Sequence, residues 1–374
     1  MYLRVLVLSL AAAAFALLSG CEGTGDLRPF ATGPDTEVSV VMDSTHWNGP
    51  IGEAIRASLA EYIDTLPAPE PLLDLRHVNL TSPTDFERVK QRKNVVFVAP
   101  IADSTNEAQV LRSVLDEEAR QAVTSGQVPA VVVPRDSPFR QQQQVIYITG
   151  TSPESIIGGI EQNTGDLRYL FAEIIRERLN AEMFEKRRQF NLEDTLLTRH
   201  DFAVNVQHDY RIATDTTDFV WLRRILSDTW RSLFVYYEDN FNPNDLTPEW
   251  ILATRDSLTQ RYLQGNVEGA VIIDRPPRRP LVIENIDFLG RYGFETRGLW
   301  ITGVKTPNGP RVVGGGGPFV NYSFYDEQTG RVYMIDGMVF APGYEKREFL
   351  RQMEVIAYTF RTDAELNQQI QQAD

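Results

Sequence analysis

Two pairs of adjacent acidic residues are the candidates for catalysis in this sequence of 374 residues. They are Glu238–Asp239 and Asp326–Glu327, and both lie in polar stretches between apolar runs. Two carboxylates that face each other in a cleft can serve as general acid and general base in hydrolysis. Adjacent acids are usually just solvated, so the pairs support a hydrolase only as an alternative, and no catalytic residue is assigned.

The histidines carry no metalloprotease signature. They are His46, His77, His200 and His208, and no H-E-x-x-H motif occurs. About 25 Å of extended chain would separate His200 from His208, which is too far for one metal ion. We expect all four at the surface or at strand ends, and no metal is assigned.

Motifs of nucleophilic and phosphate-binding enzymes are also missing. The sequence contains neither G-x-S-x-G nor S-x-x-K, the signatures of serine hydrolases and penicillin-binding enzymes. The glycine run Gly314–Gly317 precedes a predicted strand and lacks the Gly-Lys-Ser/Thr of a phosphate cradle. We therefore expect a flexible loop that leads into the strand, and no cofactor.

Two polar segments could bind a ligand. The loop Glu238–Asp245 is rich in the oxygen donors that calcium prefers, but it lacks the glycine and glutamate of an EF-hand. Arg275, Arg278 and Arg279 lie among prolines and could grip an anionic partner. The alternative for the first segment is a solvated loop, and the alternative for the second is a stiff exposed turn.

The tryptophans could stack on sugars, but their apolar surroundings favour a place in the core. They are Trp47, Trp221, Trp230, Trp250 and Trp300.

Cys21, the only cysteine, is the residue to which the sequence does assign a chemical role. Arg4 and an apolar run from Val5 to Leu18 precede it. That run is shorter than the roughly 20 residues of a transmembrane helix and is typical of a signal peptide. The segment Leu18–Cys21 resembles a lipobox, where the leader is cleaved and the thiol receives a diacylglycerol. We expect residues 1–20 to be removed and Cys21 to anchor the protein to a membrane.

This signal predicts a lipoprotein of the cell envelope. Glu22 follows the cysteine in place of the aspartate that retains some lipoproteins in the inner membrane, which favours the outer membrane. The acidic run Glu22–Asp26 is too dilute for a surface-export signal, which favours the periplasmic face. The net charge of −14 disfavours binding to nucleic acids, because their phosphates repel an acidic protein. Anionic lipids repel it as well, so we expect the lipid on Cys21 alone to attach the protein to the membrane.

Composition and periodicity divide the rest of the chain. Residues 21–36 read as a flexible tether, 37–190 as an N-terminal domain and 200–374 as a C-terminal domain. In the first domain, strands are predicted at 38–42, 72–80, 94–99, 129–134 and 144–149, with helices at 51–62, 83–92, 108–122 and from 153 onward. In the second, strands are predicted at 202–206, 219–226, 230–237, 267–273, 281–288, 292–302, 318–325 and 331–340, with helices at 247–264 and 346–360.

Sequential strands with few helices between them indicate an α+β fold rather than a doubly wound parallel sheet. We expect two domains with mainly antiparallel sheets covered by helices. In pattern alone, the C-terminal half resembles the α/β/α sandwich of the PsbP type. That resemblance implies binding or scaffolding of other proteins.

A closer resemblance extends over most of the chain after the leader. It is carried, in order, by Trp47–Gly52, Leu66–Pro71, Phe219–Arg224, Gly316–Phe319, Asp336–Pro342 and Lys346–Glu348. Together these segments are similar to a family of uncharacterised cell-envelope lipoproteins from Bacteroidota-type bacteria, a domain of unknown function. The resemblance implies no activity. We therefore expect a non-catalytic binding or scaffold protein with an envelope protein or glycan as partner, and an envelope hydrolase as the alternative.

Overall fold

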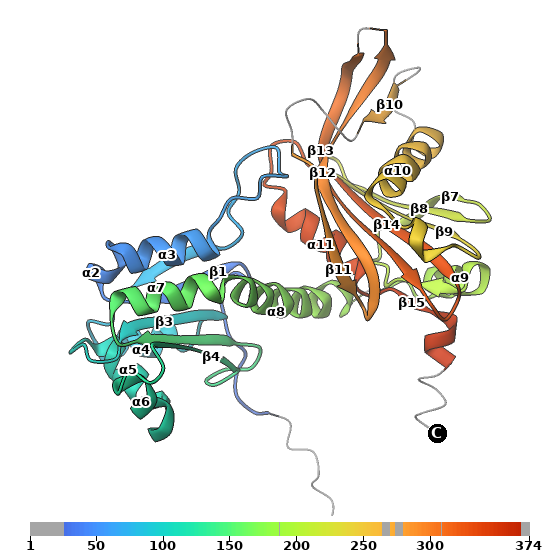
Figure 1. The fold of residues 1–374 in the computed structure, drawn as a ribbon. Coiled ribbons are helices and arrows are strands. Elements are labelled where there is room, and N and C mark those ends of the chain that lie inside the picture. Colours follow the sequence, from blue (N-terminus) through green and yellow to red (C-terminus); the bar gives the residue numbers. More distant parts are fainter. Residues whose placement is uncertain (1–25, 187, 264–269, 274–279, 308, 368–374) are drawn as a thin grey trace, which may run out of the picture. The chain divides into compact units, whose positions relative to one another are not determined.

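The computed structural model describes residues 26–186, 188–263, 270–273, 280–307 and 309–367 (Figure 1). These residues form two compact units, and the division does not follow the order of the sequence. Unit 1 contains the described residues up to Ala54 together with Leu75–Asn163. Unit 2 contains Ile55–Asp74 and the chain from Thr164 onward. The predicted leader and Cys21 lie outside the described residues.

Unit 1 is built on a five-stranded sheet with the order β2-β1-β3-β5-β4. Strands β1, β3 and β5 are parallel, and β4 joins the edge antiparallel to β5. The strands are β1 Glu37–Val41, β2 Asp74–Val78, β3 Asn94–Pro100, β4 Ala130–Asp136 and β5 Gln144–Gly150. The helices are α2 Ser44–Trp47, α4 Pro83–Val89, α5 Asn106–Val114, α6 Glu117–Thr124 and α7 Pro153–Gln162. Helix α3 Pro50–Leu59 belongs to unit 1 up to Ala54.

This sheet is mainly parallel, which differs from the antiparallel pairing that the sequence predicts for the first domain. Parallel neighbours need long crossover connections, and the helices between the strands provide them. Every residue of β3 and β5 is buried, as expected for strands covered by helices. On one face Val95 and Phe97 pack with Leu111 of α5.

Unit 2 is built on an eight-stranded antiparallel sheet with the order β10-β12-β13-β14-β9-β8-β7, and β11 pairs with β12. Its strands are β7 Arg211–Asp215, β8 Phe219–Ile225, β9 Trp230–Glu238, β10 Ala270–Ile273, β11 Val282–Phe288, β12 Arg291–Thr306, β13 Gly309–Asp326 and β14 Arg331–Phe340. Strands β6 Phe202–Ala203 and β15 Arg361–Thr362 pair separately. The helices are α8 Thr164–Phe184, α9 Phe190–His200, α10 Pro248–Tyr262 and α11 Arg347–Ala357, with a 3-10 turn at Pro243–Asp245.

Alternate residues of this sheet enter two different cores, because successive side chains of a strand point to opposite faces. Val220 and Leu222 of β8 pack with residues of α11, whereas Phe219 and Trp221 pack with residues of α10. The two helices therefore cover opposite faces of the sheet (Figure 1). The predicted α+β class and the helix-covered antiparallel sheet are confirmed for this unit.

Three local differences from the predicted elements have clear causes. The predicted helix 108–122 is divided into α5 and α6, because the side chain of Asp116 caps a new helix by accepting a hydrogen bond from the N–H of Ala119. Residues 190–200, left between the predicted domains, form α9. The short edge strand β7 was not predicted. In the described part of the chain, no helix combines the length and apolar character needed to cross a bilayer.

Candidate functional site

A charged cleft of about 660 Å³ in unit 2 is the candidate site. Its walls are the loop after α3, one side of α8, strands β11 and β12, and α11. The acidic lining residues are Glu61, Asp64, Glu284, Glu295 and Glu354, and the basic ones are Arg168, Arg297, Arg347 and Arg351. Because the two signs nearly balance, the cleft suits a ligand with little net charge and many hydrogen-bonding groups.

The carboxylate of Glu70 attaches the loop wall of the cleft to α11. It accepts hydrogen bonds from the backbone N–H groups of Lys346 and Arg347, each at 2.8 Å. The guanidinium of Arg347 in turn donates to the carbonyl of Pro71 at 2.6 Å and pairs with Asp74 at 2.6 Å. The first N–H groups of a helix have no partner within the helix, and the helix dipole favours an anion there. The loop is therefore held by specific polar contacts.

Arg297 of β12 holds two carboxylates in place at the cleft. Its Nε atom lies 2.5 Å from Oε1 of Glu295, and its Nη1 atom lies 2.7 Å from Oε1 of Glu354. Burial by itself would lower the pKa of Arg297, but these carboxylates raise it well above its usual range. Burial would raise the pKa of Glu295, but the charge of Arg297 and its hydrogen bond lower it. Arg297 and Glu295 therefore stay ionised at neutral pH.

The cleft also contains an unused hydroxyl and two open aromatic rings. Thr65 is only 3% exposed, and its Oγ1 atom has no hydrogen-bond partner among the described residues. A buried polar group without a partner costs about 1–3 kcal/mol, so a ligand that bonds to it gains stability. Tyr62 and Tyr169 are 61% and 60% exposed and offer flat apolar faces.

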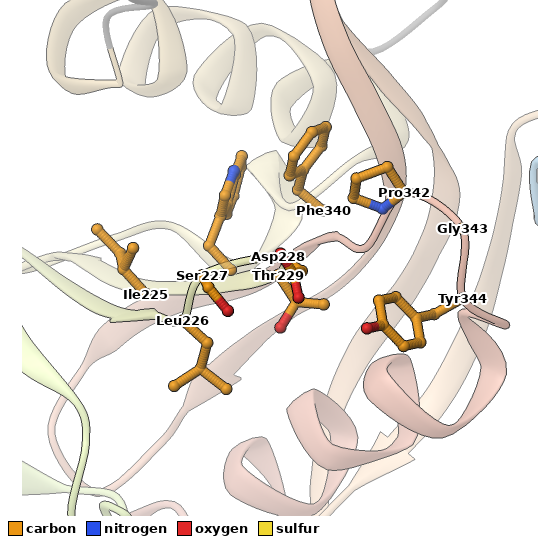
Figure 2. A pocket seen from close by; sticks show the side chains of 10 residues that line it. Ile225, Leu226, Ser227, Asp228, Thr229, Phe340, Pro342, Gly343 and Tyr344 are labelled. Atoms are coloured by element: carbon orange, nitrogen blue, oxygen red, sulfur yellow. The ribbon is translucent and has the colours of Figure 1, made fainter.

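A second concave surface, a mainly apolar hollow, lies between the β8–β9 turn and the chain that leads to α11. Figure 2 shows Ile225 and Leu226 on one side of this hollow and Pro342 and Tyr344 on the other. Asp228 is the charged residue of its lining. The hollow provides apolar contact area with few directional groups, whereas a selective site needs several placed polar groups. The charged cleft is therefore the better candidate.

The acidic pairs that the sequence proposed for hydrolysis lie elsewhere. Glu238 and Glu327 are exposed to solvent. Asp239 pairs with Arg331 at 2.6 Å. Of the described residues that line the charged cleft, none belongs to either pair.

Asp326, the remaining member, is a buried structural anion. Its Oδ1 atom accepts from Nε of Arg291 at 2.7 Å, and its Oδ2 atom accepts from the hydroxyl of Thr329 at 2.6 Å. Burial by itself would raise the pKa of Asp326, but the bonds from Thr329 and Arg291 lower it below its usual value. A carboxyl with a lowered pKa is a poor proton donor at neutral pH.

His200 is buried, which corrects the prediction of a surface or strand-end histidine. Its Nε2 atom lies 2.9 Å from Oδ1 of Asp215, and its Nδ1 atom lies 3.0 Å from the hydroxyl of Tyr237. Tyr237 donates its own proton to the carbonyl of Thr217 at 2.5 Å. The imidazole thus links α9 to the sheet and has a structural role.

The other histidines are scattered. The Nε2 atom of His46, in α2, lies 2.6 Å from Oδ2 of Asp103, which follows β3. His77 stacks on Trp47 with ring centroids 4.9 Å apart, and His208 is exposed. In the part of the chain that the structure describes, no three His, Cys, Asp or Glu side chains come together as a metal site.

In the loop proposed for calcium, a side-chain oxygen accepts a hydrogen bond from the backbone of the same loop. The side chain of Asn242 accepts from the N–H of Asn244 at 3.2 Å, which caps the 3-10 turn. Trp300 is buried, as expected for a core residue, and the other four tryptophans are partly buried. Arg275, Arg278 and Arg279 lie outside the described residues.

Gly314–Gly317 lies within β13, which corrects the prediction of a flexible loop. A Cβ atom on Gly317 would lie 1.9 Å from the carbonyl oxygen of Val339, and one on Gly316 would lie 2.4 Å from that of Trp300. The glycines therefore allow the neighbouring strands to approach closely, and they do not form a phosphate site.

The sequence did not reveal the cleft, because its residues come from distant segments of the chain. One signal was present: Glu295 and Arg297 are two positions apart, so in a strand they point to the same face and can pair. No comparable pattern connects them to Glu354, which lies 57 positions from Arg297 in the chain.

Comparison with known families divides the chain in two. Residues 189–359 match a domain of unknown function, DUF4837. Residues 31–184 match a second domain of unknown function, DUF8532. The expectation of a domain of unknown function is confirmed at this level. A search of curated proteins finds no match.

Two solved structures resemble parts of this chain. A crystal structure from Bacteroides thetaiotaomicron VPI-5482 has a TM-score of 0.25 and 8% identity, covering 43% of this chain and 45% of the other. The likeness thus spans less than half of that protein. Human StAR-related lipid transfer protein 5 has a TM-score of 0.17 and 16% identity, covering 49% of this chain and 95% of its own.

Proposed function

We propose that the protein is a non-catalytic cell-envelope lipoprotein, anchored through Cys21, that binds a glycan in the charged cleft of unit 2. The carrying observation is the nearly balanced set of carboxylates and guanidiniums in a cleft with exposed tyrosine rings. Sugars present many hydroxyl groups, which both donate and accept hydrogen bonds, and apolar ring faces, which stack on aromatic side chains.

The ionisation of the cleft supports binding over hydrolysis. A general acid needs a carboxyl whose pKa is raised, but the pKa of Glu295 is lowered because Arg297 outweighs the effect of burial. Fixed ion pairs also keep the donors and acceptors in place before the ligand arrives, which reduces the entropy cost of binding.

Calorimetric titration of the protein with neutral oligosaccharides of glucose, mannose and N-acetylglucosamine tests the cleft. We expect one of them to bind and Tyr62→Ala or Tyr169→Ala to weaken it roughly threefold to tenfold, the loss of one stacking contact. The matched control is Tyr292→Ala, because Tyr292 is 58% exposed and lies outside the cleft lining. Binding that survives both cleft substitutions would exclude this site.

Thr65→Val provides a second test with little structural disturbance. Valine has nearly the shape of threonine but no hydroxyl, and this hydroxyl has no partner among the described residues. The free energy of unfolding should stay the same or rise, while glycan affinity falls. A variant that loses stability and keeps full affinity would contradict the assignment.

The anchor is tested independently with Cys21→Ser. The wild-type protein should fractionate with membranes and carry a diacylglycerol detectable by mass spectrometry. The serine variant should lack the modification and leave the membrane fraction. Protease treatment of intact cells reports the membrane face, and rapid loss of the protein would contradict the periplasmic orientation.

A further inference from the structure

Two arginines lie directly opposite each other on neighbouring strands of unit 2. Arg224 of β8 is in register with Arg231 of β9. Because side chains alternate along a strand, both point to the face that carries Leu222 and Leu233. Like charges directly opposite each other destabilise an antiparallel pair of strands, so this arrangement lowers the stability of the sheet.

Few carboxylates lie near the two guanidiniums, so their positive charges are incompletely balanced. Arg231 is only 4% exposed; its Nη1 atom donates to the neutral amide oxygen of Gln352, and the guanidinium lies 5.0 Å from the ring of Phe349. Arg224 pairs with Oδ2 of Asp209 at 3.1 Å. Among the described residues, no carboxylate forms an ion pair with Arg231. A buried cation without a counter-charge is expensive.

Hydrogen-bond donors also remain unused. The Nε atoms of Arg224 and Arg231 are both buried and have no acceptor among the described residues. The neighbouring Tyr210 is a neutral group and adds no negative charge. Its hydroxyl donates to the sulfur of Met353 at 3.8 Å. His208 lies 3.0 Å from the carboxylate of Asp209 and competes for it.

We propose that Arg224 and Arg231 form a binding site for an oxyanion, the carboxylate or phosphate group of an acidic ligand. The planar guanidinium matches both groups and binds them through paired hydrogen bonds. Asp209, the partner of Arg224, and its neighbour His208 connect the arginine pair to solvent, since their side chains are 38% and 40% exposed. The bound group supplies the second negative charge that the arginine pair lacks. None of these residues lines the charged cleft, so the site is independent of glycan binding.

The test uses the full chain in a non-ionic detergent at constant ionic strength set with sodium chloride. Inorganic phosphate is followed by phosphorus NMR, and acetate is followed in separate samples by proton NMR. We expect saturable binding of one or both ions, and the ion that binds identifies the preferred group. Arg231→Gln and Arg224→Gln should each weaken it by roughly tenfold or more, the loss of one charge-assisted hydrogen bond.

Arg311→Gln is the matched control, because Arg311 is an exposed arginine of β13 and should not affect binding. If Arg231→Gln does not fold, Arg224→Gln still tests the site, since its side chain is 15% exposed and lies at the rim. Absence of saturable binding by both ions overturns the proposal. So does undiminished binding in Arg224→Gln, or an equal loss in Arg311→Gln, which would indicate only general charge attraction.

Discussion

The Nε atom of Arg255 lies 2.6 Å from Oδ2 of Asp336, and both side chains are completely buried between α10 and β14. Asn321 donates to the same oxygen at 3.0 Å, and the guanidinium lies 3.5 Å from the ring centroid of Phe319. A charge pair removed from water is tolerated only when such additional partners complete it. This pair fixes the position of α10 on the sheet.

Removal of one member should therefore be costly. We expect Asp336→Ala to lower the free energy of unfolding by about 3–5 kcal/mol, because the guanidinium of Arg255 is left buried and uncompensated. Urea denaturation measures the change. The double substitution Arg255→Met with Asp336→Leu should recover much of the loss. Glu327→Ala, at an exposed acid, should change stability by less than about 0.5 kcal/mol.

Asp326 should make the protein sensitive to acid. Its pKa is lowered in the folded state, so its contribution to stability is present above the unfolded value of about 3.9 and is lost as the pH falls through the lower folded value. Urea midpoints measured from neutral pH down to about pH 2 should fall across this interval. Asp326→Asn should be less stable at neutral pH and should show a smaller further loss in acid.

Glu70 should control the loop wall of the cleft. Glu70→Ala removes the acceptor for two N–H groups at the start of α11 and should cost about 1–2 kcal/mol, as for the loss of a helix cap. Hydrogen exchange at the N–H of Arg347 should speed up, together with exchange in residues 61–74. Asp64→Ala is the control, because this acid is exposed and belongs to the same loop. Equal exchange in both variants would show that Glu70 does not hold the loop.

Glycine at 317 should be required by packing. Gly317→Ala would place a Cβ atom 1.9 Å from a carbonyl oxygen of β14, so the strands must separate and stability should fall by several kcal/mol, on the order of an overpacked core. Gly165→Ala, in α8, meets no atom within 4 Å and should raise stability by up to about 1 kcal/mol. Thermal denaturation compares the two. An unchanged midpoint for Gly317→Ala would contradict the close approach.

Much of unit 2 could be predicted from the sequence because its signals are local. Thr247 and Pro248 mark the start of α10, and the side chain of Thr247 does accept a hydrogen bond from the N–H of Trp250. The predicted hairpin around residues 326–330 is present as β13 and β14. Turn residues and apolar periodicity act within a few positions, so tertiary contacts do not need to be known.

The segments that carry the family resemblance acquire a physical explanation only in the folded chain. Leu66–Pro71 and Lys346–Glu348 are far apart in sequence, yet Glu70 bonds to the backbone of Lys346 and Arg347. No local rule joins them, because the energy of this contact depends on a helix terminus that exists only after folding.

By itself, the sequence determined the α+β class and most helices and strands, because each depends on short-range patterns of apolar residues. The tertiary structure alone decided that the first sheet is mainly parallel and that the cleft exists. It also decided that His200 is buried against Asp215 and that Asp326 is buried against Arg291. Strand direction and charge pairing are settled by which distant segments bury their apolar faces together, and the residues of the cleft become neighbours only through that burial.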